Sequence, residues 1–324
     1  MGKIWMVYAL KQTKGEMRMK RAIVKPLLTV LSLAVALVMI VPAGSASAAD
    51  SKWINKVLAD YKAYNQKVTS SYKNYQEQID ASYNQYLTQY TATMTELETK
   101  VLSDLKQWDE KLEADYNELK EKYGDDRSKT SALRTYDRYI NQNFRGSPMN
   151  LYATEANRNY RDSTMWVYNK ALNENFIDSK TWRYSKAINP NYLDSAAFKY
   201  SKAVNENYYD SPMQRLKHAS SKNFYGSPIY QYSRGKISKT KAQQEYAKIY
   251  KKQTERLNAI VAKSKQDIAN RAAVTRQELD LLHAKSVDVL EQRREEALKK
   301  ISDLRIEICG EGLTWQPLLK NSAQ

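Results

Sequence analysis

The chain has 324 residues and a net charge of +16, with 9 glycines, 7 prolines and 25 tyrosines. Its mean hydropathy is −0.73 and 27% of its residues are charged, which excludes a multi-span membrane protein. One cysteine excludes an internal disulfide framework. The scarcity of glycine and proline favours long helices, so the sequence predicts an all-α protein.

Residues 1–49 are expected to be a signal peptide. Basic residues from Lys20 onward precede an apolar run over 27–41, and small residues follow it. This order predicts cleavage by signal peptidase after Ala48 or Ala49.

The first methionine is not the only candidate start, because Met17 and Met19 lie just before the basic residues. An uncleaved membrane anchor is the alternative to a signal peptide, but the apolar run is short for a span. The segment resembles the signal peptides of proteins secreted by Gram-positive bacteria. That resemblance implies a secreted protein.

A long helix is predicted over residues 50–123, because no glycine occurs between Gly44 and Gly124. Its apolar residues recur with the spacing 4, 3, 4, which repeats every eleven residues; the first of each set are Val57, Val68, Ile79, Tyr90, Val101 and Leu112. Eleven residues in three turns keep an apolar stripe nearly straight along a helix and are typical of a hendecad coiled coil. A lipid-surface helix is the alternative, but the face is narrow and rich in tyrosine.

A second long helix is predicted over residues 237–308, with a looser stripe of the same period. Its members are Tyr246, Leu257, Ile268, Leu279, Leu290 and Ile301. Equal length and equal period predict an antiparallel coiled-coil hairpin, with the intervening residues at its far end. Residues 309–324 form a tail. Cys309 is either an incidental thiol at the helix end or half of a disulfide between chains.

Residues 124–236 contain a sixteen-residue sequence in six tandem copies. The copies begin at Asn141, Asn157, Asn173, Asn189, Asn205 and Ser221. Position 3 is always asparagine: Asn143, Asn159, Asn175, Asn191, Asn207 and Asn223. Position 7 is always serine: Ser147, Ser163, Ser179, Ser195, Ser211 and Ser227. Residues 125–140 look like a degenerate first copy. These tandem copies predict a repeat architecture.

Each repeat is predicted to be a short helix and a turn. The serine can cap the helix, and Pro148, Pro212 and Pro228 follow it at the first helical position. Apolar residues at positions 9, 12 and 16 share one face, which stacked repeats could bury in a solenoid. A β-solenoid is the alternative.

The repeats carry the basic charge, with 18 Lys and Arg against 10 Asp and Glu over 124–236. We expect aromatic and basic side chains on their surface to form equivalent weak sites for sugar rings or polyanions. The polymer-binding candidates are Trp166, Trp182, Tyr230, Lys170, Lys186 and Lys202. For most of the aromatic residues, burial in the core of the solenoid is the preferred interpretation.

We expect no catalytic, cofactor-binding or metal-binding residues. His218 and His283 lack neighbours at ligand spacing, and the N-x-N-x-x-D stretch lacks the central glycine and final glutamate of a calcium loop.

The sequence predicts a secreted, cell-wall-associated binding protein. Its coiled-coil stalk would present a basic repeat head to teichoic acid, to peptidoglycan or to another copy, and the coiled coil could form a homo-oligomer. The alternatives are a membrane-active helical hairpin, as in pore-forming toxins, and a regulator of a wall hydrolase. Nucleic acid and small-molecule substrates are not expected.

Overall fold

The computed structural model describes residues 46–314, with side chains placed from Ser51 onward. Nearly all of the predicted signal peptide, and the tail after residue 314, lie outside the described residues. The chain divides into two parts between Ala49 and Asp50, and the second is described here by itself. Its described residues form α-helices and no strands, which confirms the all-α prediction.

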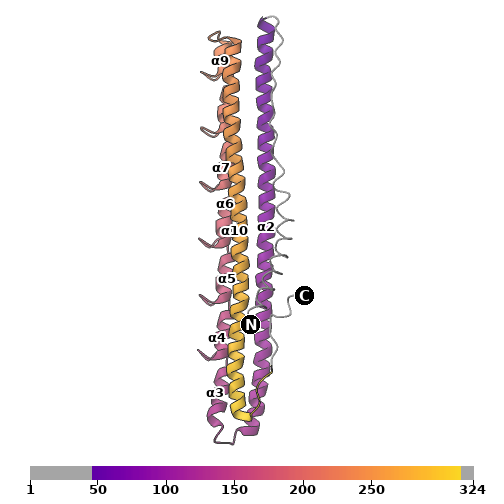
Figure 1. The fold of residues 1–324 in the computed structure, drawn as a ribbon, viewed down its shortest axis with the longest axis vertical. Helices are drawn as coiled ribbons and strands as arrows, with labels where there is room; N and C mark the ends of the chain where they lie inside the picture. Colours follow the sequence, from indigo (N-terminus) through magenta and orange to yellow (C-terminus); the bar gives the residue numbers. More distant parts are fainter. Residues whose placement is uncertain (1–45, 315–324) are drawn as a thin grey trace, which may run out of the picture. The chain divides into compact units, whose positions relative to one another are not determined.

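Two long helices come before and after a series of short ones in the chain, and the short ones lie beside the second long helix (Figure 1). The long helices are α2, Ala46–Tyr123, and α10, Lys239–Cys309. Between them come α3 Thr130–Ile140, α4 Pro148–Ala156, α5 Thr164–Leu172, α6 Lys180–Ile188, α7 Ala196–Val204, α8 Pro212–Ala219 and α9 Pro228–Ser233. Ser238 caps the start of α10, and Gly310 with φ of 80° ends it.

The prediction that the long helices pair antiparallel is wrong, because they run parallel. Tyr90 donates a hydrogen bond to Asp280, and the next contacts along α2 join Asp104 to Arg294 and Asp115 to Arg305. In each pair the partners are 190 residues apart. A constant difference between the residue numbers of the partners means that the two helices run in the same direction. In an antiparallel pair the sum of the two residue numbers would be constant instead.

The prediction of a repeat head at the far end of a stalk is also wrong. The short helices α3 to α9 run back along α10 for its whole length, and each of them contacts it (Figure 1). This return path brings the chain back to the starting end before α10 begins. The second long helix must then point the same way as the first.

One sixteen-residue repeat advances by the same distance as eleven residues of a long helix. Tyr136 donates a hydrogen bond to Asp115, and Tyr152, sixteen residues later, donates one to Asp104, eleven residues earlier. Eleven helical residues rise about 16.5 Å. Each repeat therefore forms a layer with eleven residues from α2 and eleven from α10.

The repeats bury the face at positions 9, 12 and 16 against the long helices. In the layer of α6, Thr181, Tyr184 and Ile188 are 0%, 2% and 5% exposed. At position 12 the first six residues are buried and Tyr232 of the last repeat is half-buried; the buried ones are Tyr136, Tyr152, Tyr168, Tyr184, Tyr200 and Leu216. The core is thus built from three chain segments in every layer, and the narrow stripe of each long helix is covered.

Two layers contain an ion pair between α2 and α10, which is buried in one layer and half-buried in the other. The Arg294 Nε lies 2.8 Å from Asp104, and the two side chains are 2% and 7% exposed. The same pair recurs eleven residues on, between Arg305 and Asp115, also at 2.8 Å. Because an unpaired buried charge is costly, these pairs disfavour any shift of α2 against α10.

Within residues 46–314, no helix is long and apolar enough to cross a membrane. Cys309 is the last residue of α10, and its half-buried thiol donates to the carbonyl oxygen of Arg305 at 3.2 Å.

Candidate functional site

Seven residues of each repeat form a loop that projects from the side of the helices (Figure 1). We call these loops the loop ladder; they are residues 141–147, 157–163, 173–179, 189–195, 205–211 and 221–227. Since consecutive repeats are one layer apart, equivalent loop atoms recur about every 16.5 Å.

Each loop is fixed by its own polar groups. In the loop that begins at Asn173, the side-chain oxygen of Asn173 accepts from the backbone N–H of Asn175 at 2.9 Å. Ser179 donates to the Asn173 carbonyl at 2.6 Å and accepts from the N–H of Trp182 at 2.9 Å, which caps α6. The first and seventh positions are therefore needed to hold the loop and start the helix.

Position 6 of the loop has a left-handed backbone conformation. Gly146 and Gly226 have φ of 82° and 86°, and the other loops place aspartate there, with φ between 59° and 68°. Aspartate tolerates this conformation better than most residues. The resemblance to a calcium loop therefore has a backbone explanation, and the described residues contain no group of three His, Cys, Asp or Glu placed to hold a metal.

Asparagine at position 3 has no comparable role in the loop. The side chains of the position-3 asparagines are exposed in all six loops. Among them only Asn207 has a side-chain hydrogen bond within residues 51–314, from the Lys217 ammonium at 2.9 Å. The residue recurs six times, while in the other five loops its amide is left available to solvent or a ligand.

Basic side chains link the short helix of one repeat to the loop of the next by cation–π contacts. The Lys170 ammonium lies 4.7 Å from the ring centre of Trp166 and 4.2 Å from that of Phe176. Lys186 repeats this arrangement between Trp182 at 5.3 Å and Tyr192 at 3.9 Å. The ammonium positions are thereby fixed on the loop side of the molecule.

The pattern continues at Lys202, whose ammonium lies 4.5 Å from the Tyr208 ring. In the next repeat His218 takes the lysine position and stacks on Phe224, with ring centres 3.8 Å apart. Partial burial and, less strongly, the charge of Lys217 lower the pKa of His218. This repeat therefore lacks a cation at that position at neutral pH.

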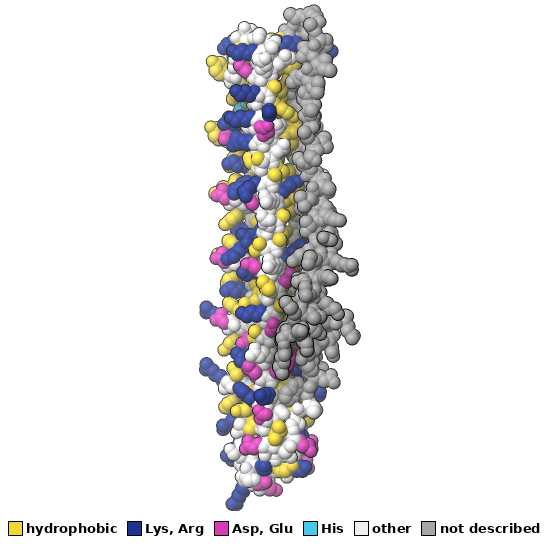
Figure 2. All heavy atoms as spheres, in the orientation of Figure 1, with side chains coloured by type: hydrophobic (Ala, Val, Ile, Leu, Met, Phe, Trp, Pro, Cys, Tyr) yellow, Lys and Arg dark blue, Asp and Glu magenta, His cyan; other side chains and the backbone are white. Residues whose placement is uncertain are grey.

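Among the predicted binding residues, Tyr230 lies in the last repeat and belongs to a different cluster. Its ring is 5.5 Å from Tyr225, with the ammonium of Lys236 at 5.8 Å and the guanidinium of Arg234 at 5.5 Å. The structure thus groups the other five predicted residues in three neighbouring repeats and separates Tyr230 from them. Figure 2 shows Lys and Arg alternating with hydrophobic side chains along this edge.

Sequence reasoning did not identify the loop tips as an exposed apolar series. Position 5 is exposed in four consecutive loops, by 68% to 84%, with Ile177, Leu193, Tyr209 and Tyr225. The earlier loops carry Arg145 and Arg161 there. The sequence did contain a signal for this exposed series: position 5 is occupied by these residues in four repeats, and each of them follows an aromatic residue.

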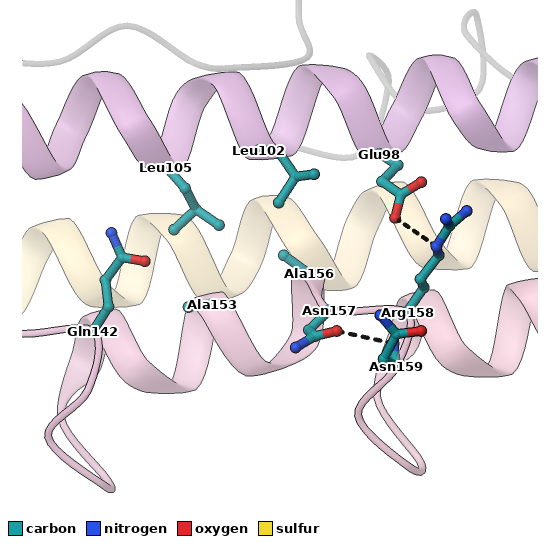
Figure 3. A pocket seen from close by; sticks show the side chains of 9 residues that line it. All are labelled: Glu98, Leu102, Leu105, Gln142, Ala153, Ala156, Asn157, Arg158 and Asn159. Carbon is teal, nitrogen blue, oxygen red and sulfur yellow. Dashed lines mark hydrogen bonds and ion pairs between the residues drawn. The ribbon is translucent and has the colours of Figure 1, made fainter.

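Two clefts open beside the loops. The larger, of about 450 Å³, lies between α2 and the repeats, where Arg158 pairs with Glu98 at 3.3 Å (Figure 3). Asn157 closes its loop by accepting from the Asn159 N–H there. The smaller, of about 350 Å³, lies beside α6. It is lined by Glu174, Asn175, Trp182, Ser185, Lys186 and Asn189.

Comparisons of the chain with protein-family models, curated proteins and solved structures find no match, so its function is inferred from the loop ladder and the clefts alone.

Proposed function

We propose that the protein is a secreted, non-enzymatic binding protein of the bacterial cell surface. The loop ladder, together with the aromatic residues and lysines of the short helices beside it, binds an anionic polymer of the envelope, such as teichoic acid or peptidoglycan, along the side of the molecule. The observation that carries this proposal is the recurrence of one basic and aromatic arrangement at intervals of about 16.5 Å on one side.

Charge and geometry both support a polymer as the ligand. The repeat region has a net charge of +8, from 18 basic and 10 acidic residues. A shallow site on each repeat binds weakly, but several such sites on one rigid support raise the overall affinity for a linear ligand without new contacts.

The test is sedimentation of the purified protein with wall sacculi, with and without teichoic acid, at low and high salt. We expect pelleting that falls with salt, because exposed charges are screened over about 8–10 Å at physiological ionic strength. Replacing Lys170, Lys186 and Lys202 by glutamine should reduce it.

The matched control removes the same charge from exposed lysines of α10, with Lys251→Gln, Lys252→Gln and Lys299→Gln. Equal losses in both triple variants would show that net charge alone acts and that the loop ladder has no special role. If the unaltered protein does not pellet at all, the proposed function is wrong.

The exposed loop tips favour a second candidate, association with another copy. Ile177, Leu193, Tyr209 and Tyr225 present apolar surface on consecutive loops. Sedimentation velocity would detect this as a concentration-dependent increase in mass. Replacing all four by serine should abolish the increase if the tips form the contact.

A further inference from the structure

We propose that three central repeats each contain a cleft for a pyranose ring, so that a glycan strand bridges them. The inference rests on the proposed function and names the part of the polymer that is recognised. The cleft beside α6 combines an indole ring, an asparagine amide and a lysine ammonium in a space of about 350 Å³. A flat apolar surface beside a few polar groups suits a sugar ring, which has apolar faces and a polar rim.

Some polar side chains that line the cleft form hydrogen bonds within the protein, and others have no hydrogen-bond partner there. One Glu174 oxygen accepts from the Tyr83 hydroxyl at 2.7 Å, and Ser185 donates to the Trp182 carbonyl at 2.9 Å. Both side chains are thereby anchored. Within residues 51–314, the amide of Asn175 and the indole N–H of Trp182 have no hydrogen-bond partner, so they remain available to sugar hydroxyls.

The aromatic residue at position 10 is not required by the loop. In the repeat that begins at Asn141, Asn150 occupies this position, accepts from the Gly146 N–H at 3.0 Å and donates to the Gln142 carbonyl at 2.7 Å. Gln214 similarly accepts from the Asp210 N–H at 2.7 Å. An amide side chain at position 10 therefore stabilises the loop, whereas an aromatic side chain there does not form these hydrogen bonds.

Three consecutive repeats have an aromatic residue instead of an amide at position 10. Each of them also has a lysine four residues later, at position 14. The residues at these two positions are Trp166 and Lys170, Trp182 and Lys186, and Phe198 and Lys202. The repeats on either side place Asn150 and Gln214 at position 10 instead. The aromatic residue and the lysine thus occur together where the clefts would form a continuous row, which spans about 33 Å from first to third at 1.5 Å per helical residue.

The test is a titration of the purified protein with glycan strands of the cell wall, stripped of peptide and teichoic acid, followed by tryptophan fluorescence. Polyglycerol phosphate, which is anionic but lacks a sugar ring, is the second probe. We expect the glycan strands to bind. The double variant Trp166→Gln, Trp182→Gln restores the amide found in neighbouring repeats and should bind the strands at least about tenfold more weakly.

The fold of the double variant is checked by its thermal unfolding, and its binding is measured by calorimetry because two fluorophores are lost. Leu281→Ala, which removes a 64% exposed side chain of α10 outside the loop ladder and the clefts, should leave glycan affinity unchanged. Equal affinity of the double variant and the unaltered protein would overturn the inference. Binding of polyglycerol phosphate without binding of glycan would overturn it and leave the proposed function standing, whereas failure of both probes would refute both proposals.

Discussion

The match between sixteen residues of repeat and eleven residues of each long helix can be tested by deletion. Removing residues 173–188 alone deletes one repeat, so Leu172 must reach Asn189 across an additional layer of about 16.5 Å. That distance needs about five more extended residues, which the loop does not have. The remaining repeats must then shift or leave one layer uncovered.

The cost follows from the side chains that lose their burial. Tyr184 and Ile188 are 2% and 5% exposed. Burial of a large apolar side chain contributes about 1.5–3 kcal/mol, so their loss costs about 3–6 kcal/mol. At about 2–4 °C per kcal/mol for a domain of this size, the melting temperature should fall by about 6–24 °C.

The matched variant also lacks residues 79–89 of α2 and 268–278 of α10. This triple deletion removes a whole layer, so every remaining contact keeps its register. We expect a melting temperature near that of the unaltered protein by circular dichroism. Small-angle scattering should show a maximum dimension shorter by about 16.5 Å. If the triple deletion is as unstable as the single one, the repeats and long helices are not in register as described.

Three further predictions concern stability. Arg294→Met leaves Asp104 buried without its cation and should cost about 3–5 kcal/mol in urea unfolding, whereas Lys263→Ala, in an exposed pair, should cost less than about 1 kcal/mol. An unchanged midpoint for the arginine variant would contradict the role of the buried pair. Ser179→Ala removes a helix cap and should lower the free energy of unfolding by about 1–2 kcal/mol, and a loss below a few tenths would show that the loop does not depend on the serine. Burial, the largest cause in each case, raises the pKa of several tyrosines to about 12; they are Tyr64, Tyr86, Tyr168, Tyr200 and Tyr246. Their folded pKa exceeds the unfolded value of about 10, so the stability they contribute is complete below pH 10 and is lost as the pH rises toward 12. Unfolding and tyrosinate absorbance should therefore appear together in this range, and gradual ionisation without unfolding would refute the coupling.

The long helices could be predicted because a strict period and a lack of breakers act locally. The repeat could be divided into turn and helix for the same reason, since Ser179 and its equivalents cap a helix from within the loop. Local signals of this kind need no knowledge of the partner.

The direction of pairing could not be obtained from the same signals. A stripe with an eleven-residue period packs against a parallel or an antiparallel partner equally well. What decides the direction is the path of the chain between the helices, because the repeats are long enough to return along the whole of α10. The polar residues of the core contain the missing information: Asp104 and Asp115 on α2 have the same spacing as Arg294 and Arg305 on α10.

The sequence predicted which residues form the candidate site, but not which of them lie together. The lysines and tryptophans were identified by their repeat positions, while Tyr230 shares the position without sharing the neighbours. Whether a repeat belongs to the group of three depends on the side chain at position 14. The structure was needed to show that Lys170 and Lys186 each contact two aromatic rings.

The return path of the repeats also gives the molecule unlike sides. The loop ladder belongs to a region with a net charge of +8, whereas residues 50–123, which include most of α2, contain 10 basic and 13 acidic residues. If the proposed function is correct, this transverse asymmetry turns the basic side toward the negatively charged polymer, so that the protein lies along it. Contact area then grows in proportion to the number of repeats, and a longer variant would adhere more strongly without any change in the chemistry of a single loop.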